Sequence, residues 1–319
     1  MDGLTPESDI AREGLMEKSP KQINGAISLS GFEEAKPHYG EFRRVVRVFF
    51  GRKLALVGFL IIMALILTAI FAPILAPYNP YKMDMTQALQ QPSREHLLGT
   101  DSLGRDNLSR VIYGSRVSLL VAIGAIGGAA IVGQSLGLMA AYFGGVVYQV
   151  IMRITDALMA VPMILIAMVI ASVLGGGLKN VIIALGIGMV PVQCRMMCGQ
   201  ALTIMQNDYI MAARSIGTGD FRMMIRHIFP NAFPSILIVM TVGLGTTILA
   251  EAGLSFLGVG VLPPEAAWGS MISDGYKFIL TNPMLSFAPG IAIMLVVFGF
   301  NMVGDGLRDA LDPRLRGTF

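Results

Sequence analysis

Charge is scarce in this sequence. Only 14% of its 319 residues are charged, whereas 54% are hydrophobic, and the mean hydropathy is +0.65. A soluble domain of this length usually carries about a quarter of charged residues. The chain therefore has too little polar surface to cover a water-soluble globule. Its net charge of +3 is small and gives no indication of a nucleic-acid partner.

Cysteine and histidine are scarce as well. Cys194 and Cys198 are the only cysteines, and one disulfide at most could not stabilise a fold of this size, so the sequence indicates no disulfide framework. Their i, i+4 spacing puts both thiols on one helix face. Two thiols could bind a soft metal, but no histidine or third cysteine is near, so close packing is the better account and we expect no metal. The three histidines are scattered, and none forms part of a catalytic dyad.

Long apolar runs are what the sequence does have. The clearest, Leu54–Ala76, is uncharged and long enough to cross a bilayer. Pro162 and Pro191 interrupt two of the other candidates, which blurs their boundaries. The remaining five predicted spans are Leu119–Ala141, Ala157–Leu174, Val181–Met197, Ile236–Phe256 and Leu285–Val303.

The distribution of Lys and Arg predicts the orientation of these spans. With six spans and both termini in the cytoplasm, 17 of the 24 Lys and Arg residues lie inside and seven outside. This follows the rule that cytoplasmic segments carry the positive charge. The predicted organisation is a cytosolic tail (1–53), a first transmembrane helix (54–76), an external loop (77–116), a five-helix core (117–304) with a cytoplasmic loop (198–233), and a cytosolic tail (305–319).

The cytoplasmic segment DYIMAARSIGTGDFRMMIRHIFPN predicts a helix, a tight turn and a second helix. Ala212 and Ala213 favour the first helix, and Gly217 can take the left-handed conformation that ends one. Asp220 is a suitable N-cap for the second helix, which should stop at Pro230. The alternative is that this segment merely connects two spans.

The same segment resembles the cytoplasmic loop of the permease subunits of ABC importers, whose signature is Glu-Ala-Ala followed by Gly. Met211 stands where that family has Glu. Several other stretches resemble the dipeptide/oligopeptide/nickel branch, in particular its C-type permease. They are LLGTDSLGRDNLSRVIYGSR (97–116), EAGLSFLGVG (251–260), PPEAAWGSMI (263–272) and GDGLRDALDPRLR (304–316).

The resemblance implies a six-span permease of the type I importer fold in the bacterial inner membrane, forming half of a peptide pathway. Its partners would be a homologous permease, two ATPase subunits and an external solute-binding protein. The chain lacks a phosphate-binding Gly-x-x-x-x-Gly-Lys loop, so ATP would be hydrolysed by the ATPase subunits and no cofactor bound here. The residues implied to dock on the ATPase are Met211, Ala212, Ala213, Arg214, Gly217 and Asp220. We expect Met211 to pack on an apolar patch of that partner.

The external side has its own candidates. Asp101, Ser102, Gly104 and Asp106 do not have the spacing of a calcium loop, so we expect them to form a turn that contacts the solute-binding protein. Asp101, Gly104, Arg105, Asp106 and Glu251 are our candidates for the external loop and gate. Trp268 belongs to a second external segment and is a further candidate for the gate.

Glu251 is predicted within two turns of the outer end of its span. A carboxylate at that depth is costly unless it has a partner. We expect Glu251 either to pair with an external arginine, such as Arg105 or Arg110, or to cap the turn at Gly253. The alternative is a proton relay, but the spans offer no chain of further titratable groups.

Other functions remain open at this point. A secondary transporter or channel would favour an internal repeat or pairs of ionisable residues inside the membrane. A membrane scaffold would lack the cytoplasmic loop. Nickel or another small solute is the alternative within the family.

Overall fold

The computed structural model describes residues 41–311, and the chain divides into two units, Met1–Glu41 and Phe42–Phe319. Most of the predicted N-terminal tail (1–40) and the last part of the C-terminal tail (312–319) lie outside the described residues. Between residues 41 and 311 the structure is helical without strands, apart from one isolated bridge between Thr100 and Asp106. The all-helical prediction is confirmed.

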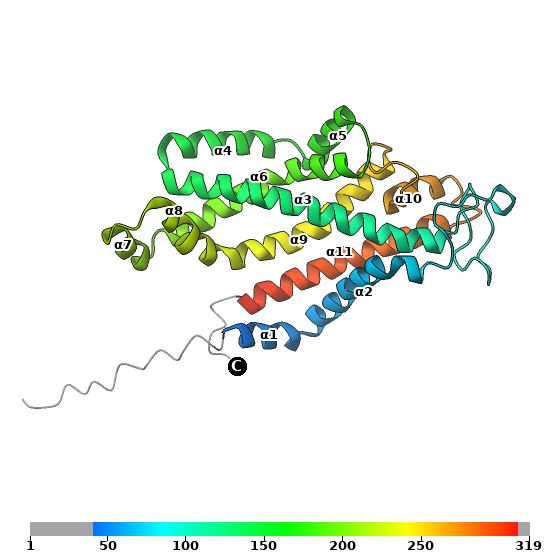
Figure 1. The fold of residues 1–319 in the computed structure, drawn as a ribbon, viewed down its shortest axis with the longest axis horizontal. Coiled ribbons are helices and arrows are strands. Elements are labelled where there is room, and N and C mark those ends of the chain that lie inside the picture. The colour runs from blue at the N-terminus through cyan, green and yellow to red at the C-terminus, as the bar shows by residue number, and fades with distance from the viewer. Residues whose placement is uncertain (1–40, 312–319) are drawn as a thin grey trace, which may run out of the picture. The chain divides into compact units, whose positions relative to one another are not determined.

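The helices follow one another in chain order (Figure 1). Their bounds are α1 Glu41–Gly51, α2 Lys53–Leu75, η3 Met85–Gln87, α3 Asn107–Phe143, α4 Gly145–Met159, α5 Met163–Leu174, α6 Leu178–Ile204, α7 Asp208–Ser215, α8 Asp220–Arg222, the π-helical η4 Met223–Ile228, α9 Phe229–Phe256, α10 Trp268–Tyr276 and α11 Met284–Leu311.

Five helical stretches are long and apolar enough to cross a membrane: α2, α3, α6, α8 to α9 taken together, and α11. The pair α4 and α5 makes a sixth if it is one span, and it is bent by 88° at the break. Pro162 lies at that break, where its missing N–H and fixed φ favour a new helix start. The predicted third span, 157–174, therefore covers α5 and only the end of α4, and the two helices meet at the sharp bend.

Helix α3 is far longer than predicted and takes over the end of the predicted external loop 77–116. It begins at Asn107 because the Asp106 carboxylate accepts hydrogen bonds from the backbone N–H and the hydroxyl of Ser109, at 2.8 and 2.7 Å. The external loop therefore ends at residue 106.

The predicted N-terminal tail 1–53 also contains structure, since α1 occupies its last part. Phe49 is buried and packs with Ala55 of α2 and Ala310 of α11. Next to this cluster, Arg52 forms an ion pair of 2.6 Å with Asp309. The start of the first span and the end of the last span therefore lie together, as an even number of spans requires.

Helices α3 and α6 meet in a seam that is the most extensive helix–helix contact of the described residues. A Cβ atom at Gly133 would lie 2.7 Å from that of Gln193, and one at Gly137 would lie 2.2 Å from the carbonyl oxygen of Cys194. Cys194 and Cys198 are both buried in this seam. The Gly-x-x-x-Gly pair thus allows backbone contact, and the cysteines fill the seam as small side chains.

Candidate functional site

Helix α7 is attached to the body by one narrow face. Ile210 and Ala213 are buried and join an apolar cluster with Met223 and Ile228. Met211, Ala212 and Arg214 are exposed on the other side. Figure 1 places α7 and α8 at one end of the helices and α10 at the opposite end.

Gly217 ends α7 as predicted. Its φ is +79°, and the N–H groups of Gly217 and Thr218 donate to the carbonyls of Arg214 and Ala213, at 2.9 and 3.2 Å. This is the hydrogen-bond pattern of a Schellman motif, in which a left-handed residue satisfies the last free carbonyls of a helix.

The second predicted helix differs from the prediction in two ways. Asp220 is its first residue and makes no capping hydrogen bond, and Gly219 takes the N-cap position. The helix also continues past Pro230 into α9, without the predicted stop. A π-helical segment, Met223–Ile228, precedes the proline, and the Asn231 side chain donates to the carbonyl of His227 at 2.6 Å. The wider π-helical turn just before Pro230 accommodates a residue that lacks an N–H.

Several large apolar side chains on α7, on α8 and in the turn between them are exposed. Ile216 is 84% exposed and Phe221 is 74% exposed. We call this set the inner apolar surface, and its members are Tyr209, Met211, Ile216 and Phe221. Large apolar side chains exposed on a short helix between two spans are candidates for contact with a protein partner.

Tyr142, at the end of α3, was missed by sequence reasoning although it touches two predicted residues. Its hydroxyl donates a 2.7 Å hydrogen bond to the Asp220 carboxylate. The guanidinium carbon of Arg214 lies 5.4 Å from the centre of its ring. No pattern around Tyr142 in the sequence indicates this contact, because it depends on how α3 meets a segment 78 residues away.

The external candidates form a separate cluster, in which Asp101 is the centre. One oxygen of its carboxylate accepts from the backbone N–H groups of Leu103 and Arg105, both at 2.9 Å. The other pairs with Nε of Arg105 at 2.7 Å and faces Nε of Arg110 at 3.6 Å. All three charged side chains are buried, so the carboxylate is engaged by its own loop and by the first turn of α3.

Gly104 and Asp106 lock the same loop. Gly104 has a φ of +72°, and a Cβ atom there would lie 1.8 Å from the carbonyl oxygen of Asp84. Asp106 caps α3 and also contacts Nδ1 of His96 at 2.9 Å. The prediction of a turn rather than a calcium loop agrees with these contacts.

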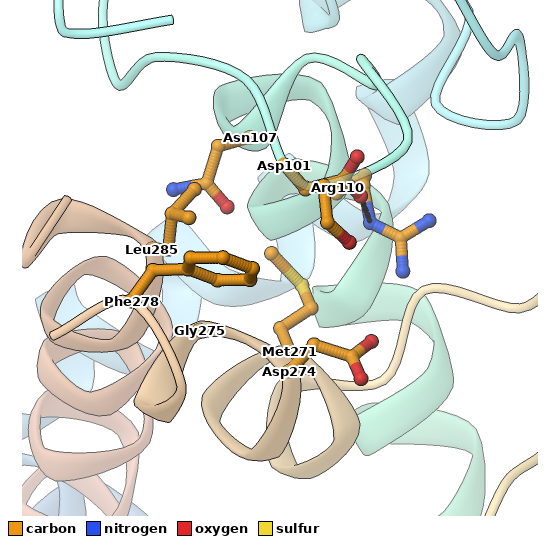
Figure 2. A pocket seen from close by; sticks show the side chains of 9 residues that line it. Asp101, Asn107, Arg110, Met271, Asp274, Gly275, Phe278 and Leu285 are labelled. Carbon is orange, nitrogen blue, oxygen red and sulfur yellow. Dashed lines mark ion pairs between the residues drawn. The ribbon is translucent and has the colours of Figure 1, made fainter. Parts of the chain in front are cut away.

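A small pocket separates this loop from α10. Figure 2 shows Asp101 and Arg110 on one side and Met271, Asp274 and Phe278 on the other.

Trp268 closes the same region from α10. It is buried, its Nε1–H donates to the carbonyl of Val111 at 2.9 Å, and it fits over Gly114 of α3. The side chain thus fixes α10 against α3.

Glu251 has a different environment from the one suggested by the sequence. Arg105 and Arg110 are engaged with Asp101, and Glu251 is fully buried. Its Oε1 accepts from the Ser255 hydroxyl at 2.7 Å. Among the residues that the structure describes, its Oε2 has no hydrogen-bond partner. The expected arginine partner is therefore wrong, and Ser255 takes that place because it lies one turn further along α9.

Two further features line the body between these ends. A groove runs between α3 and α9, with Gly127, Ile131, Gln134, Ser135 and Met240 among its lining residues. Asp156 of α4 and Arg195 of α6 form an ion pair in which both side chains are half exposed. Sequence reasoning missed this pair because Asp156 lies just outside the predicted third span.

The fold and these two ends define a multi-pass helical membrane protein built to work with other subunits. Residues 133–317 match the model of the binding-protein-dependent transport system inner membrane component, and residues 40–92 match the N-terminal TM domain of oligopeptide transport permease C. The chain belongs to this family of inner-membrane transport components.

Curated relatives agree over most of the chain. The dipeptide transport system permease protein DppC of Alkalihalophilus pseudofirmus is 45% identical over 264 residues, 83% of this chain and 87% of the relative. The glutathione transport system permease protein GsiD of Pectobacterium atrosepticum is 38% identical over 86% of this chain and 92% of its own length. GsiD of Escherichia coli O157:H7 is 42% identical over 92% and 97%.

Among solved structures, the inward-facing MetNI methionine ABC transporter contains a chain with a similar fold. The TM-score is 0.53 at 19% identity, over 64% of this chain and 97% of that one. The likeness confirms the predicted fold of an ABC importer permease. The family match and the curated relatives identify the chain as an inner-membrane permease subunit.

Proposed function

We propose that this permease carries short peptides inward and is driven by ATPase subunits that dock on the inner apolar surface. The names of the relatives support the choice of solute. One group serves dipeptides and another serves glutathione, which is itself a tripeptide. A pathway that admits two or three residues with free charged ends fits both.

The exposed face of α7 is the observation that carries the ATPase proposal. A short helix with apolar residues on its outer side suits a groove in a partner, where those residues become buried. Met211 is 54% exposed, so it is available to pack there in place of the carboxylate that the family usually has.

A complete transporter on this proposal contains one further permease, two ATPases and an external solute-binding protein. Hydrolysis of ATP takes place in the ATPases, and this chain contributes movement rather than catalysis. The external loop and α10 form the surface that meets the solute-binding protein.

We place the solute pathway along the α3–α9 groove, at the junction with the second permease. Glycine and polar side chains line it together with apolar ones, namely Gly127, Gln134 and Ser135 beside Ile131. A surface of this kind can pass a solute that is both polar and apolar. Ser135→Trp should therefore block uptake and leave assembly intact, whereas Leu67→Trp on the exposed face of α2 should not.

The ATPase proposal is tested with a matched pair of variants. Ile216 is 84% exposed at the inner end, and Leu280 is 96% exposed at the outer end. Each is changed to Asp in the tagged full chain, which is then purified with its partners in mild detergent. We expect Ile216→Asp to lose the ATPase and Leu280→Asp to keep it. Retention by both variants, or absence of ATPase from the wild type, would contradict the proposal.

The solute is tested separately, by uptake in cells that lack this permease and regain it from a plasmid. Labelled dipeptides, glutathione and nickel ion are compared at equal concentration. Uptake of a peptide supports the proposal, whereas uptake of nickel alone would favour the other solute of the family.

A further inference from the structure

We propose that Tyr142 is a positioning residue that ties the coupling helix α7 to span α3, so that a movement of α7 reaches α3 directly. The inference rests on the proposed function, because it takes α7 as the helix on which the ATPase docks. It concerns the route by which that docking acts on the spans.

The order of the chain gives α7 only two covalent neighbours. Residues 205–207 connect it to α6, and the turn at Gly217 connects it through α8 and η4 to α9. Helix α3 has no such connection, although it lines the proposed pathway. Its inner end meets the α7–η4 region through an apolar cluster that includes Leu138, Ala141 and Ile210. Apolar contacts of this kind are not directional.

Tyr142 adds directional contacts at this junction. Its hydroxyl donates to Oδ1 of Asp220 at 2.7 Å, a length typical of a hydrogen bond to a charged acceptor. The Arg214 guanidinium lies over its ring, with 5.4 Å between the guanidinium carbon and the ring centre. Arg214 lies before Gly217 and Asp220 after it. One side chain of α3 therefore contacts both sides of the turn that ends the coupling helix.

Tyr142 lies at the end of α3, where a pull on its side chain can move the last turn of the helix. It is the second-last residue of the helix, and Gly144 and Gly145, with φ of +61° and +47°, reverse the chain into α4. A displacement of the Gly217 turn therefore acts on the last turn of α3, beside two glycines that permit a change of angle between α3 and α4. A movement of the docked ATPase would therefore displace α3 as well as α6 and α9.

Tyr142→Phe is the sharpest test, because it removes the hydroxyl and keeps the ring under Arg214. The assembled transporter is reconstituted in proteoliposomes, and two quantities are measured: the ATPase that co-purifies, and the peptide transported per ATP hydrolysed. We expect unchanged co-purification and about fivefold less peptide per ATP, within the range of a coupling contact. Tyr148→Phe, on α4 and also partly exposed, is the matched control and should behave as wild type.

A second variant separates positioning from general loss of structure. Asp220→Asn keeps an acceptor without the charge, so its effect should be smaller than that of Tyr142→Phe, and the double variant should be no worse than Tyr142→Phe alone. A wild-type ratio in Tyr142→Phe, an equal loss in Tyr148→Phe, or additive losses in the double variant would overturn the inference. Absence of ATPase from the wild type would instead overturn the proposed function on which the inference rests.

Discussion

The outer and inner ends of this permease use their side chains in opposite ways. At the outer end, Asp101, Arg105 and Arg110 are buried and satisfied by one another, and Trp268 is bonded to α3. At the inner end, Ile216 and Phe221 lie largely in the open. The charged groups of the outer loop are paired within the chain, although apolar side chains such as Leu280 are exposed at that end too. At the inner end, the exposed apolar side chains lie on and beside the helix that we propose to dock on the ATPase.

The largest expected difference between the two ends concerns glycine. Gly104→Ala places a Cβ atom 1.8 Å from the carbonyl oxygen of Asp84, and backbone must move to relieve the clash. We expect a loss of roughly 4 kcal/mol or more of stability, enough to prevent folding of the external loop. Gly217→Ala meets open space and keeps only the cost of its positive φ, about 1 kcal/mol. Thermal unfolding in detergent measures both, and equal losses would remove the distinction.

Loss of the outer ion pair at Asp101 should lower stability far more than loss of the ion pair between Asp156 and Arg195. Asp101→Ala leaves two buried guanidinium groups without their carboxylate, which costs about 3–5 kcal/mol. Asp156→Ala breaks a pair whose side chains are half exposed, so the loss should be about 0–1 kcal/mol. Denaturation midpoints of the two variants give the comparison. A large loss from Asp156→Ala would mean that the pair is buried by a partner in the assembly.

Substitutions of Glu251 should lower the stability by intermediate amounts. Glu251→Gln keeps an oxygen that can accept from the Ser255 hydroxyl, and we expect it to cost less than about 1 kcal/mol. Glu251→Ala leaves a cavity and an unsatisfied hydroxyl, at a cost of about 2–3 kcal/mol. Uptake assays of both variants provide the check, since a proton relay would require inactivity of Glu251→Gln despite normal folding.

The smallest expected effect on stability is that of Ile216→Asp. An exposed side chain far from the core changes stability by less than about 0.5 kcal/mol. Unfolding of the isolated chain should therefore match that of the wild type, although ATPase binding is lost. A clear fall in stability would show that the inner surface contributes to the fold itself.

The spans and the coupling turn could be predicted because local rules decide them. An uncharged run of 23 residues such as Leu54–Ala76 is favourable inside the bilayer. Gly217 is a glycine, the residue type that most readily takes the left-handed conformation at a helix end. The lengths of α3 and α9 could not be predicted from hydropathy. Helix α3 begins with a polar turn held by Asp106, and α9 passes Pro230 after a π-helical segment.

The contacts between distant segments were the hardest features to predict from the sequence. Arg105 and Arg110 were suitable partners for Glu251 by type and by predicted side, but the loop directs both toward Asp101. Likewise, Asp220 looked like a helix cap, yet its carboxylate is taken by Tyr142. In both cases a long-range contact competes with a local one, and only the three-dimensional arrangement decides between them.

The α3–α6 seam has a practical consequence for spectroscopy and chemical labelling. Cys194 and Cys198 are the only thiols of the chain, and both are shielded where α6 meets Gly137. Reagents that need an accessible sulfur should leave the folded protein unmodified. A cysteine introduced at an exposed position could therefore carry a spin label or fluorophore without removal of the native pair, which would let distances between the two ends be followed through the transport cycle.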